Sequence, residues 1–137
     1  MRIESRARSR ALQALYAWDM RPGQALDRVS VTVWDDLSVP PEERAIASRI
    51  VRVVIADGAK IDRELEAVTT NWRLERLGAI DRAVLRLAAA ELSVGETPPK
   101  VVIQEAVRLA ERYGSVQSAR FVNGIVDALA RRMGRLQ

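Results

Sequence analysis

The sequence has no cysteine and no histidine. The missing cysteines exclude disulfides, thiolate metal sites and cysteine nucleophiles, and they fit a reducing compartment such as the cytoplasm. The missing histidines remove the commonest general base and the commonest metal ligand near neutral pH. These absences predict a protein with no metal and no cofactor. They argue against an enzyme, although carboxylate or lysine chemistry stays open.

Long apolar runs and catalytic fingerprints are missing as well. No window approaches the ~20 uncharged apolar residues of a membrane span, and the basic N-terminus has no continuous apolar segment of the signal-peptide kind. There is no G-x-G-x-x-G, P-loop, G-x-S-x-G or H-E-x-x-H. Acidic clusters such as Asp35-Asp36 are expected to be solvated helix surfaces. We therefore predict no membrane association and no catalytic residue.

Lysine is scarce: the 22 basic residues comprise two lysines and twenty arginines, and the net charge is +4. Arginine binds phosphate through a bidentate fork and stacks on bases, so an arginine excess favours a polyanionic partner. A GC-rich genome would also enrich arginine. Composition leaves both explanations open, and the placement of the arginines has to decide between them.

Apolar residues recur at helical spacing along most of the 137 residues. The pattern predicts an all-α fold of six to seven helices in one compact domain, residues 1–137, with no strand. Gly58 predicts a bend or close packing inside one long helix rather than a break, Gly114 is placed to end another helix, and Ser118 is a candidate cap for the last. The expected segments are 3–20, 24–37, 42–68, a short turn at 74–77, a helix starting near Asp81, 100–113 and a C-terminal helix.

The first expected helix carries a basic stripe. Four arginines occur within ten residues and are opposed only by Glu4. On a helix they would form a basic surface that follows a phosphate backbone, while nearby amide and aromatic groups meet unstacked bases. The alternative is a solvated helix face with the tyrosine in the core. The stripe and its neighbours are Arg2, Arg6, Arg8, Arg10, Gln13 and Tyr16.

Three blocks of the sequence resemble one known family. They are RSRALQALY at residues 8–16, NWRLERLGAIDRAVLRLAAAEL at 71–92 and VIQEAVRLAERYGSVQSARFVNGIVD at 102–127. In order and spacing these blocks resemble the NusB family of transcription antitermination factors. Residues 24–63 contribute only their helical pattern to the resemblance.

The resemblance implies a fold of two packed three-helix bundles. It implies binding to the boxA element of nascent RNA together with NusE, a small-subunit ribosomal protein. It also implies participation in the RNA polymerase antitermination complex, notably on ribosomal RNA operons. Family members also include homodimers that hide the RNA surface, and the sequence leaves the oligomeric state open.

The resemblance assigns roles to individual residues. RNA contact would fall to two groups, the N-terminal Arg2, Arg6, Arg8, Arg10 and Gln13, and Ser118, Arg120 and Phe121 near the start of the last helix. Contact with NusE would fall to Tyr16 and Asp81. Phe121 could instead be a core aromatic, and Asp81 could be an ordinary acidic residue at a helix start.

Two other functions remain as alternatives. A NusB-like domain also forms the N-terminal part of some ribosomal RNA cytosine methyltransferases, which need a catalytic domain downstream. The sequence stops at Gln137 after a short basic tail, so we expect no such domain here. The other alternative is a helical scaffold without an RNA role.

Overall fold

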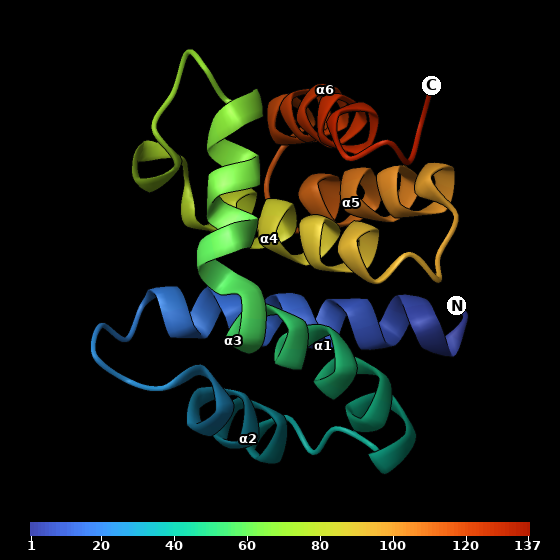
Figure 1. Ribbon diagram of the computed structural model, residues 1–137. Helices are drawn as coiled ribbons and strands as arrows, with labels where there is room; N and C mark the ends of the chain where they lie inside the picture. The colour runs from blue at the N-terminus through green and yellow to red at the C-terminus, as the bar shows by residue number, and fades with distance from the viewer.

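The computed structural model describes all residues from 1 to 137. It consists of six α-helices and one short 3-10 helix, with no strand (Figure 1). The all-α prediction is therefore confirmed, and the expected segments agree with the helices to within about two residues. In chain order the elements are α1 (Ile3–Asp19), α2 (Leu26–Asp36), α3 (Pro41–Val68), η1 (Leu74–Arg76), α4 (Ala79–Val94), α5 (Pro99–Tyr113) and α6 (Val116–Arg132).

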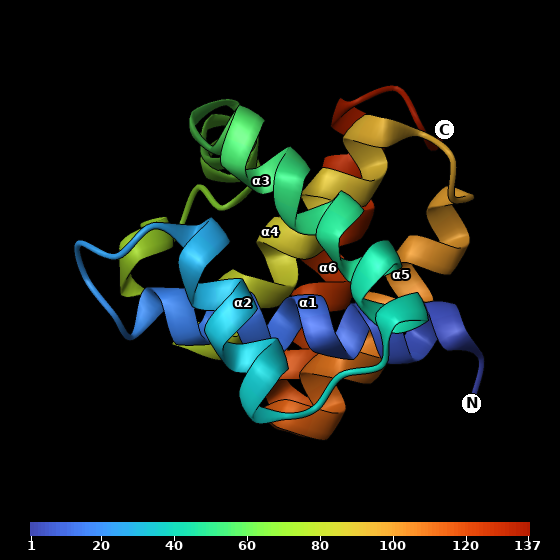
Figure 2. The same cartoon turned by 90° about the horizontal axis from the view of Figure 1, so that it is seen from below.

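The helices form two bundles that share one apolar core. Helices α1, α2 and α3 pack on one another, and α4, α5 and α6 form the second group. Helix α4 also packs on α1 and α3 and so joins the two groups, as Figures 1 and 2 show. A continuous cluster of 32 buried apolar residues draws on every α-helix. No helix in the structure is both long and apolar enough to cross a membrane.

Helix α3 bends at the position that the sequence suggested. Asp57 has a non-helical backbone, with φ −119° and ψ 21°, while the helical pattern continues on both sides. Gly58 follows it directly, and nothing lies within 4 Å of where its Cβ would be. The bend lets the first half of α3 pack in the first bundle and the second half lie against α4 (Figure 1). The helix therefore bends without breaking, as predicted, and the alternative of close packing at Gly58 is not observed.

The start of α6 differs from the prediction. The capping residue is Ser115, whose hydroxyl accepts a hydrogen bond from the backbone N–H of Ser118 at 3.0 Å. Ser118 therefore lies in the first turn as the recipient of the cap, and its assignment as the cap was wrong. The cause is local: Gly114 ends α5, so the chain turns immediately and Ser115 is the first side chain able to reach back to the free N–H groups.

Candidate nucleic-acid interface

Four arginines lie at the N-cap and in the first half of α1, and three of them face solvent. The Arg2 side chain is 87% exposed, Arg6 is well exposed and Arg10 is partly exposed. The buried carboxylate of Glu43, in the first turn of α3, lies 3.5 Å from Arg6 and 3.2 Å from Arg10. Arg10 also donates to the side-chain oxygen of Gln13 at 3.3 Å. Glu43 thus orders the basic surface and also reduces its net charge.

Arg8 does not belong to this surface. Only 7% of the residue is exposed. Its Nε donates to both carboxylate oxygens of Glu91 on α4, at 2.8 and 3.0 Å, and its Nη1 donates to Glu105 on α5 at 2.8 Å. The expectation that Arg8 joins an exposed phosphate-binding stripe is therefore wrong. A half turn of helix separates Arg8 from Arg6 and Arg10, and that rotation points it into the joint between the two bundles.

The buried cluster around Arg8 shifts the protonation of its three members. Burial lowers the pKa of Arg8, but the charge and hydrogen bonds of Glu91 and Glu105 outweigh it and raise that pKa above its ordinary value. Burial raises the pKa of Glu91 even though Arg8 opposes it. For Glu105, burial would raise the pKa, but hydrogen bonds from Ser5, Arg108 and Arg8 outweigh it and lower that pKa. The cluster is an ion network that ties α1 to α4 and α5.

The second predicted RNA surface lies at the start of α6. Arg120 is exposed there and has no ion-pair partner. Phe121 is half-buried and packs against the core, and its ring also meets the exposed Trp72 ring. The ring centroids are 5.2 Å apart and the planes are nearly perpendicular, at 87°. Phe121 therefore combines a core contact on one side with a surface aromatic on the other.

The two predicted partner residues lie on neighbouring helices. Tyr16 on α1 is 39% exposed, which excludes the core alternative for it. Asp81 lies in the first turn of α4, as a helix-start acid would, and its Oδ1 is buried without a hydrogen-bond partner. The end of α1 is joined to the start of α4 by Asp19, which accepts from Nε of Arg82 at 3.1 Å.

Arg82 also fastens the connector between α3 and α4. Its Nη1 donates to the backbone carbonyls of Leu74, Glu75 and Leu77, the last at 2.7 Å. One guanidinium therefore links α1, α4 and η1. Sequence reasoning did not single out Arg82, because nothing in its local pattern distinguishes it from a solvated arginine.

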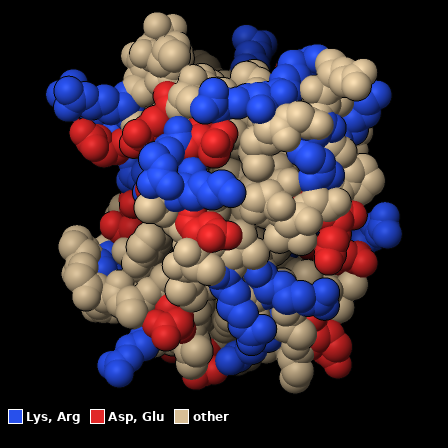
Figure 3. All heavy atoms as spheres, in the orientation of Figure 1, with Lys and Arg blue, Asp and Glu red and all other residues tan.

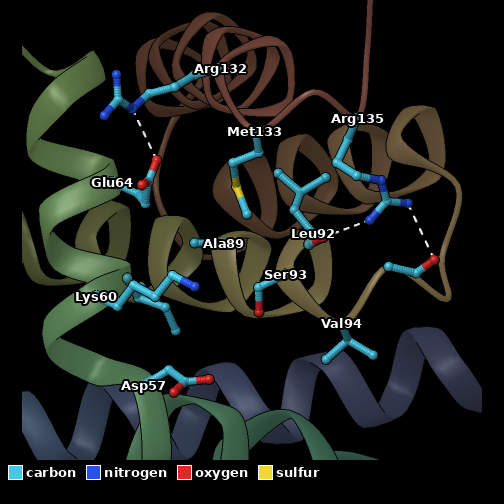
Figure 4. Close-up of a pocket in the computed structure, with 12 residues that line it drawn as sticks. Asp57, Lys60, Glu64, Ala89, Leu92, Ser93, Val94, Arg132, Met133 and Arg135 are labelled. Carbon is cyan, nitrogen blue, oxygen red and sulfur yellow. Dashed lines mark hydrogen bonds and ion pairs between the residues drawn. The ribbon is translucent and has the colours of Figure 1, made fainter.

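A cavity of about 600 Å³ lies on another side, between the second half of α3, the end of α4 and the segment after α6 (Figure 4). Its basic groups are largely engaged, since Arg132 pairs with Glu64 at 2.9 Å and Arg135 donates to the carbonyl of Leu92 at 2.7 Å. Positive and negative side chains alternate over this face of the molecule (Figure 3). None of the predicted site residues lines this cavity.

The NusB family model matches residues 5–131 of the chain. The chain belongs to the NusB family. The transcription antitermination protein NusB of Sorangium cellulosum (strain So ce56) is 44% identical, with 99% of this chain and 97% of that protein covered. The transcription antitermination protein NusB of Anaeromyxobacter dehalogenans (strain 2CP-1 / ATCC BAA-258) is 45% identical, and the match covers 92% of this chain and 89% of that protein.

A solved structure described as the antitermination factors NusB and NusE in complex with double-stranded RNA has the same fold as this NusB family member. Its TM-score is 0.87 at 28% identity, with 96% of this chain and 98% of that chain covered. The predicted NusB resemblance and fold are therefore confirmed. The two curated relatives are named as antitermination proteins and not as enzymes.

Proposed function

We propose that this protein is a transcription antitermination factor that binds boxA-type single-stranded RNA together with the ribosomal protein NusE. The observation that carries the proposal is the NusB family match, which spans residues 5–131. The likeness to a chain seen with both NusE and RNA supports the two partners. The complex would act with RNA polymerase in the cytoplasm, notably on ribosomal RNA operons, with residues 1–137 acting as one RNA-binding domain.

The RNA surface of the proposal keeps the exposed predicted residues and omits Arg8. Arg2, Arg6 and Arg10 would meet phosphates, since arginine binds them through charge-assisted hydrogen bonds. Near the start of α6, Arg120 would do the same and Phe121 would stack on a base. Gln13 and Ser118 would supply hydrogen bonds to base edges or sugars. These residues come from α1 and α6, so one strand would have to cross both bundles.

The decisive experiment compares a boxA-containing RNA with a scrambled RNA of equal length, with and without NusE. Binding should be tighter for boxA and should increase when NusE is present. Equal binding of both RNAs under both conditions would contradict antitermination and would favour the scaffold alternative.

Replacing both Arg2 and Arg6 by alanine should weaken binding of boxA and scrambled RNA to a similar extent. Each lost phosphate contact should lower the salt slope of binding by about 0.7. The measurement is the logarithm of affinity against the logarithm of salt concentration. Arg28→Ala with Arg63→Ala is the matched control, because both side chains are exposed, lie on α2 and α3 and form no ion pair. An equal loss in the control pair would mean that only net charge matters.

Tyr16→Asp and Asp81→Lys should each weaken NusE binding while RNA binding without NusE stays near wild type. The reason is that Tyr16 is exposed on α1, and Asp81 lies on the adjoining start of α4. Isothermal titration against NusE tests this, with a melting curve for each variant because Asp81 is partly buried. Wild-type NusE affinity in both folded variants would remove the proposed surface.

The proposed activity is binding and not catalysis. Nothing in the comparisons favours the methyltransferase alternative, since the Sorangium cellulosum relative is named as an antitermination protein and this chain covers 97% of it. No group of three or more Asp, Glu, His or Cys side chains is arranged to hold a metal ion. The proposed mechanism relies on the arginine, amide, hydroxyl and aromatic side chains named above.

A further inference from the structure

Trp72 differs from the other two tryptophans of the chain. Trp34 is buried and its indole N–H donates to the carbonyl of Arg10, while Trp18 is partly buried and donates to Gln24. Trp72 is 52% exposed and its indole N–H has no partner within the protein. Burial of a tryptophan stabilises a fold strongly, so the fold gains little from this residue in its present place.

The indole of Trp72 is nevertheless held in a defined position. Its ring meets that of Phe121 edge to face, with the centroids 5.2 Å apart. Phe121 in turn packs against the core. An edge-to-face pair of this kind fixes the orientation of both rings, and the exposure of Trp72 shows that much of its surface remains open.

The backbone on both sides of Trp72 is anchored. Before it, the buried Thr69 donates through its hydroxyl to the carbonyl of Leu65 at 2.9 Å, and the N–H of Trp72 donates to Thr69 at 3.0 Å. After it, Leu74 is buried and its carbonyl accepts from Arg82. The connector is therefore a fixed platform, so a ligand that stacks on the indole would not have to order the loop first.

The sequence neighbours of this aromatic pair are basic. Arg73 follows Trp72 and reaches only a weak contact of 3.6 Å with the exposed Glu75. Arg76 in η1 and Arg120 beside Phe121 are exposed and form no ion pair. An open aromatic ring with exposed arginines next to it in the sequence suits single-stranded nucleic acid, in which unstacked bases and phosphates alternate.

We propose that Trp72 stacks on an unpaired base of single-stranded RNA and extends the RNA surface from α6 onto the connector before η1. This inference rests on the proposed RNA-binding function. Because the planes of Trp72 and Phe121 are at 87°, two bases stacked on them cannot be parallel to each other. The strand must therefore bend between them, and a regular duplex, whose bases are parallel, would not satisfy both rings.

The test measures binding of the boxA RNA by Trp72→Ala and Trp72→Phe. Loss of one stacked base should weaken binding by roughly 5- to 150-fold in Trp72→Ala, with the salt slope unchanged. Trp72→Phe keeps an aromatic face and should recover most of the affinity. Tryptophan fluorescence gives an independent reading: RNA should quench the wild-type emission, and most of the quenching should vanish in Trp72→Phe, which keeps Trp18 and Trp34.

Val31→Ala is the control for exposure, because Val31 is also 52% exposed and lies on α2. Failure of the wild type to bind boxA would refute the proposed function itself. Normal wild-type binding with an unchanged affinity in Trp72→Ala would overturn only the role of Trp72. A loss of NusE affinity alone in Trp72→Ala would overturn that role too, since the ring would then contact the protein partner and not RNA.

Discussion

Replacing Arg8 by alanine should lower the free energy of unfolding by about 3–5 kcal/mol, the usual cost of leaving a buried charge without its partner. Glu91 is buried and would keep no cation, whereas Glu105 would still have Ser5 and Arg108. Urea unfolding of the variant and the wild type measures the difference. Arg6→Ala is the matched control, since Arg6 lies on the same helix but is exposed, and its cost should be within about 1 kcal/mol.

The defect of Arg8→Ala should also depend on pH. Burial already raises the folded-state pKa of Glu91 above its ordinary value of 4.5, and removing Arg8 takes away the charge that opposes this rise. A carboxyl group with a raised folded pKa loses stability as pH rises from its unfolded to its folded pKa. The difference between variant and wild type should therefore be largest at neutral pH and should shrink toward pH ~4.5, as Glu91 takes up a proton.

A compensating variant separates lost charge from lost packing. Arg8→Met combined with Glu91→Leu should recover most of the stability, because a buried ion pair can often be replaced by apolar side chains of similar volume. If Arg8→Ala instead unfolds like the wild type and loses only RNA affinity, the buried network is not the role of Arg8. Arg8 would then belong to the RNA surface.

Replacing Arg82 by alanine should lower the free energy of unfolding by about 2–3 kcal/mol and loosen the connector before α4. The cost should be smaller than for Arg8, because Asp19 would retain Arg86 at 3.8 Å. The backbone carbonyls of Leu74, Glu75 and Leu77 would lose the hydrogen bond from Arg82, although that of Leu74 would still accept from the N–H of Leu77. Hydrogen exchange should therefore become faster in residues 69–78 at denaturant concentrations too low for global unfolding.

Arg82→Lys is the control for charge. Lysine keeps the positive charge beside Asp19 but has no planar fork to reach the carbonyls as well, so exchange should still be faster in the connector. If hydrogen exchange in the connector stays at the wild-type rate in Arg82→Ala, the guanidinium does not hold it. Because Trp72 lies in this connector, weaker boxA binding should accompany any loosening.

The N-terminal arginines show where sequence reasoning reached its limit. Spacing places Arg2, Arg6 and Arg10 around one helix, and the structure leaves these three side chains accessible. Arg8 is indistinguishable from them in the sequence, yet its partners Glu91 and Glu105 lie 83 and 97 residues away. Local spacing carries no information about such distant partners. A solvated arginine and a buried one therefore look alike until the helices are packed.

Trp72 was missed for a related reason. It stands in a polar connector, and that position alone was a signal, because an aromatic residue in such a segment has no helix face to explain it. What the sequence could not show is that the ring of Phe121, on α6, lies 5.2 Å away. The assignment of Ser118 as the cap of α6 was a purely local error. Ser115 was equally able to cap that helix, and it lies next to Gly114, which ends α5.

The sequence by itself determined the helical class, the bend near Gly58 and the NusB family, because helical periodicity, helix-ending glycines and family motifs are local in the chain. Tertiary structure alone decided which charges remain free to bind and which hold the bundles together. Glu43 orders Arg6 and Arg10, while Glu91 removes Arg8 from the surface. The reason is physical: whether a side chain is charged depends on its own chemistry, but whether that charge is available depends on groups that only packing brings near.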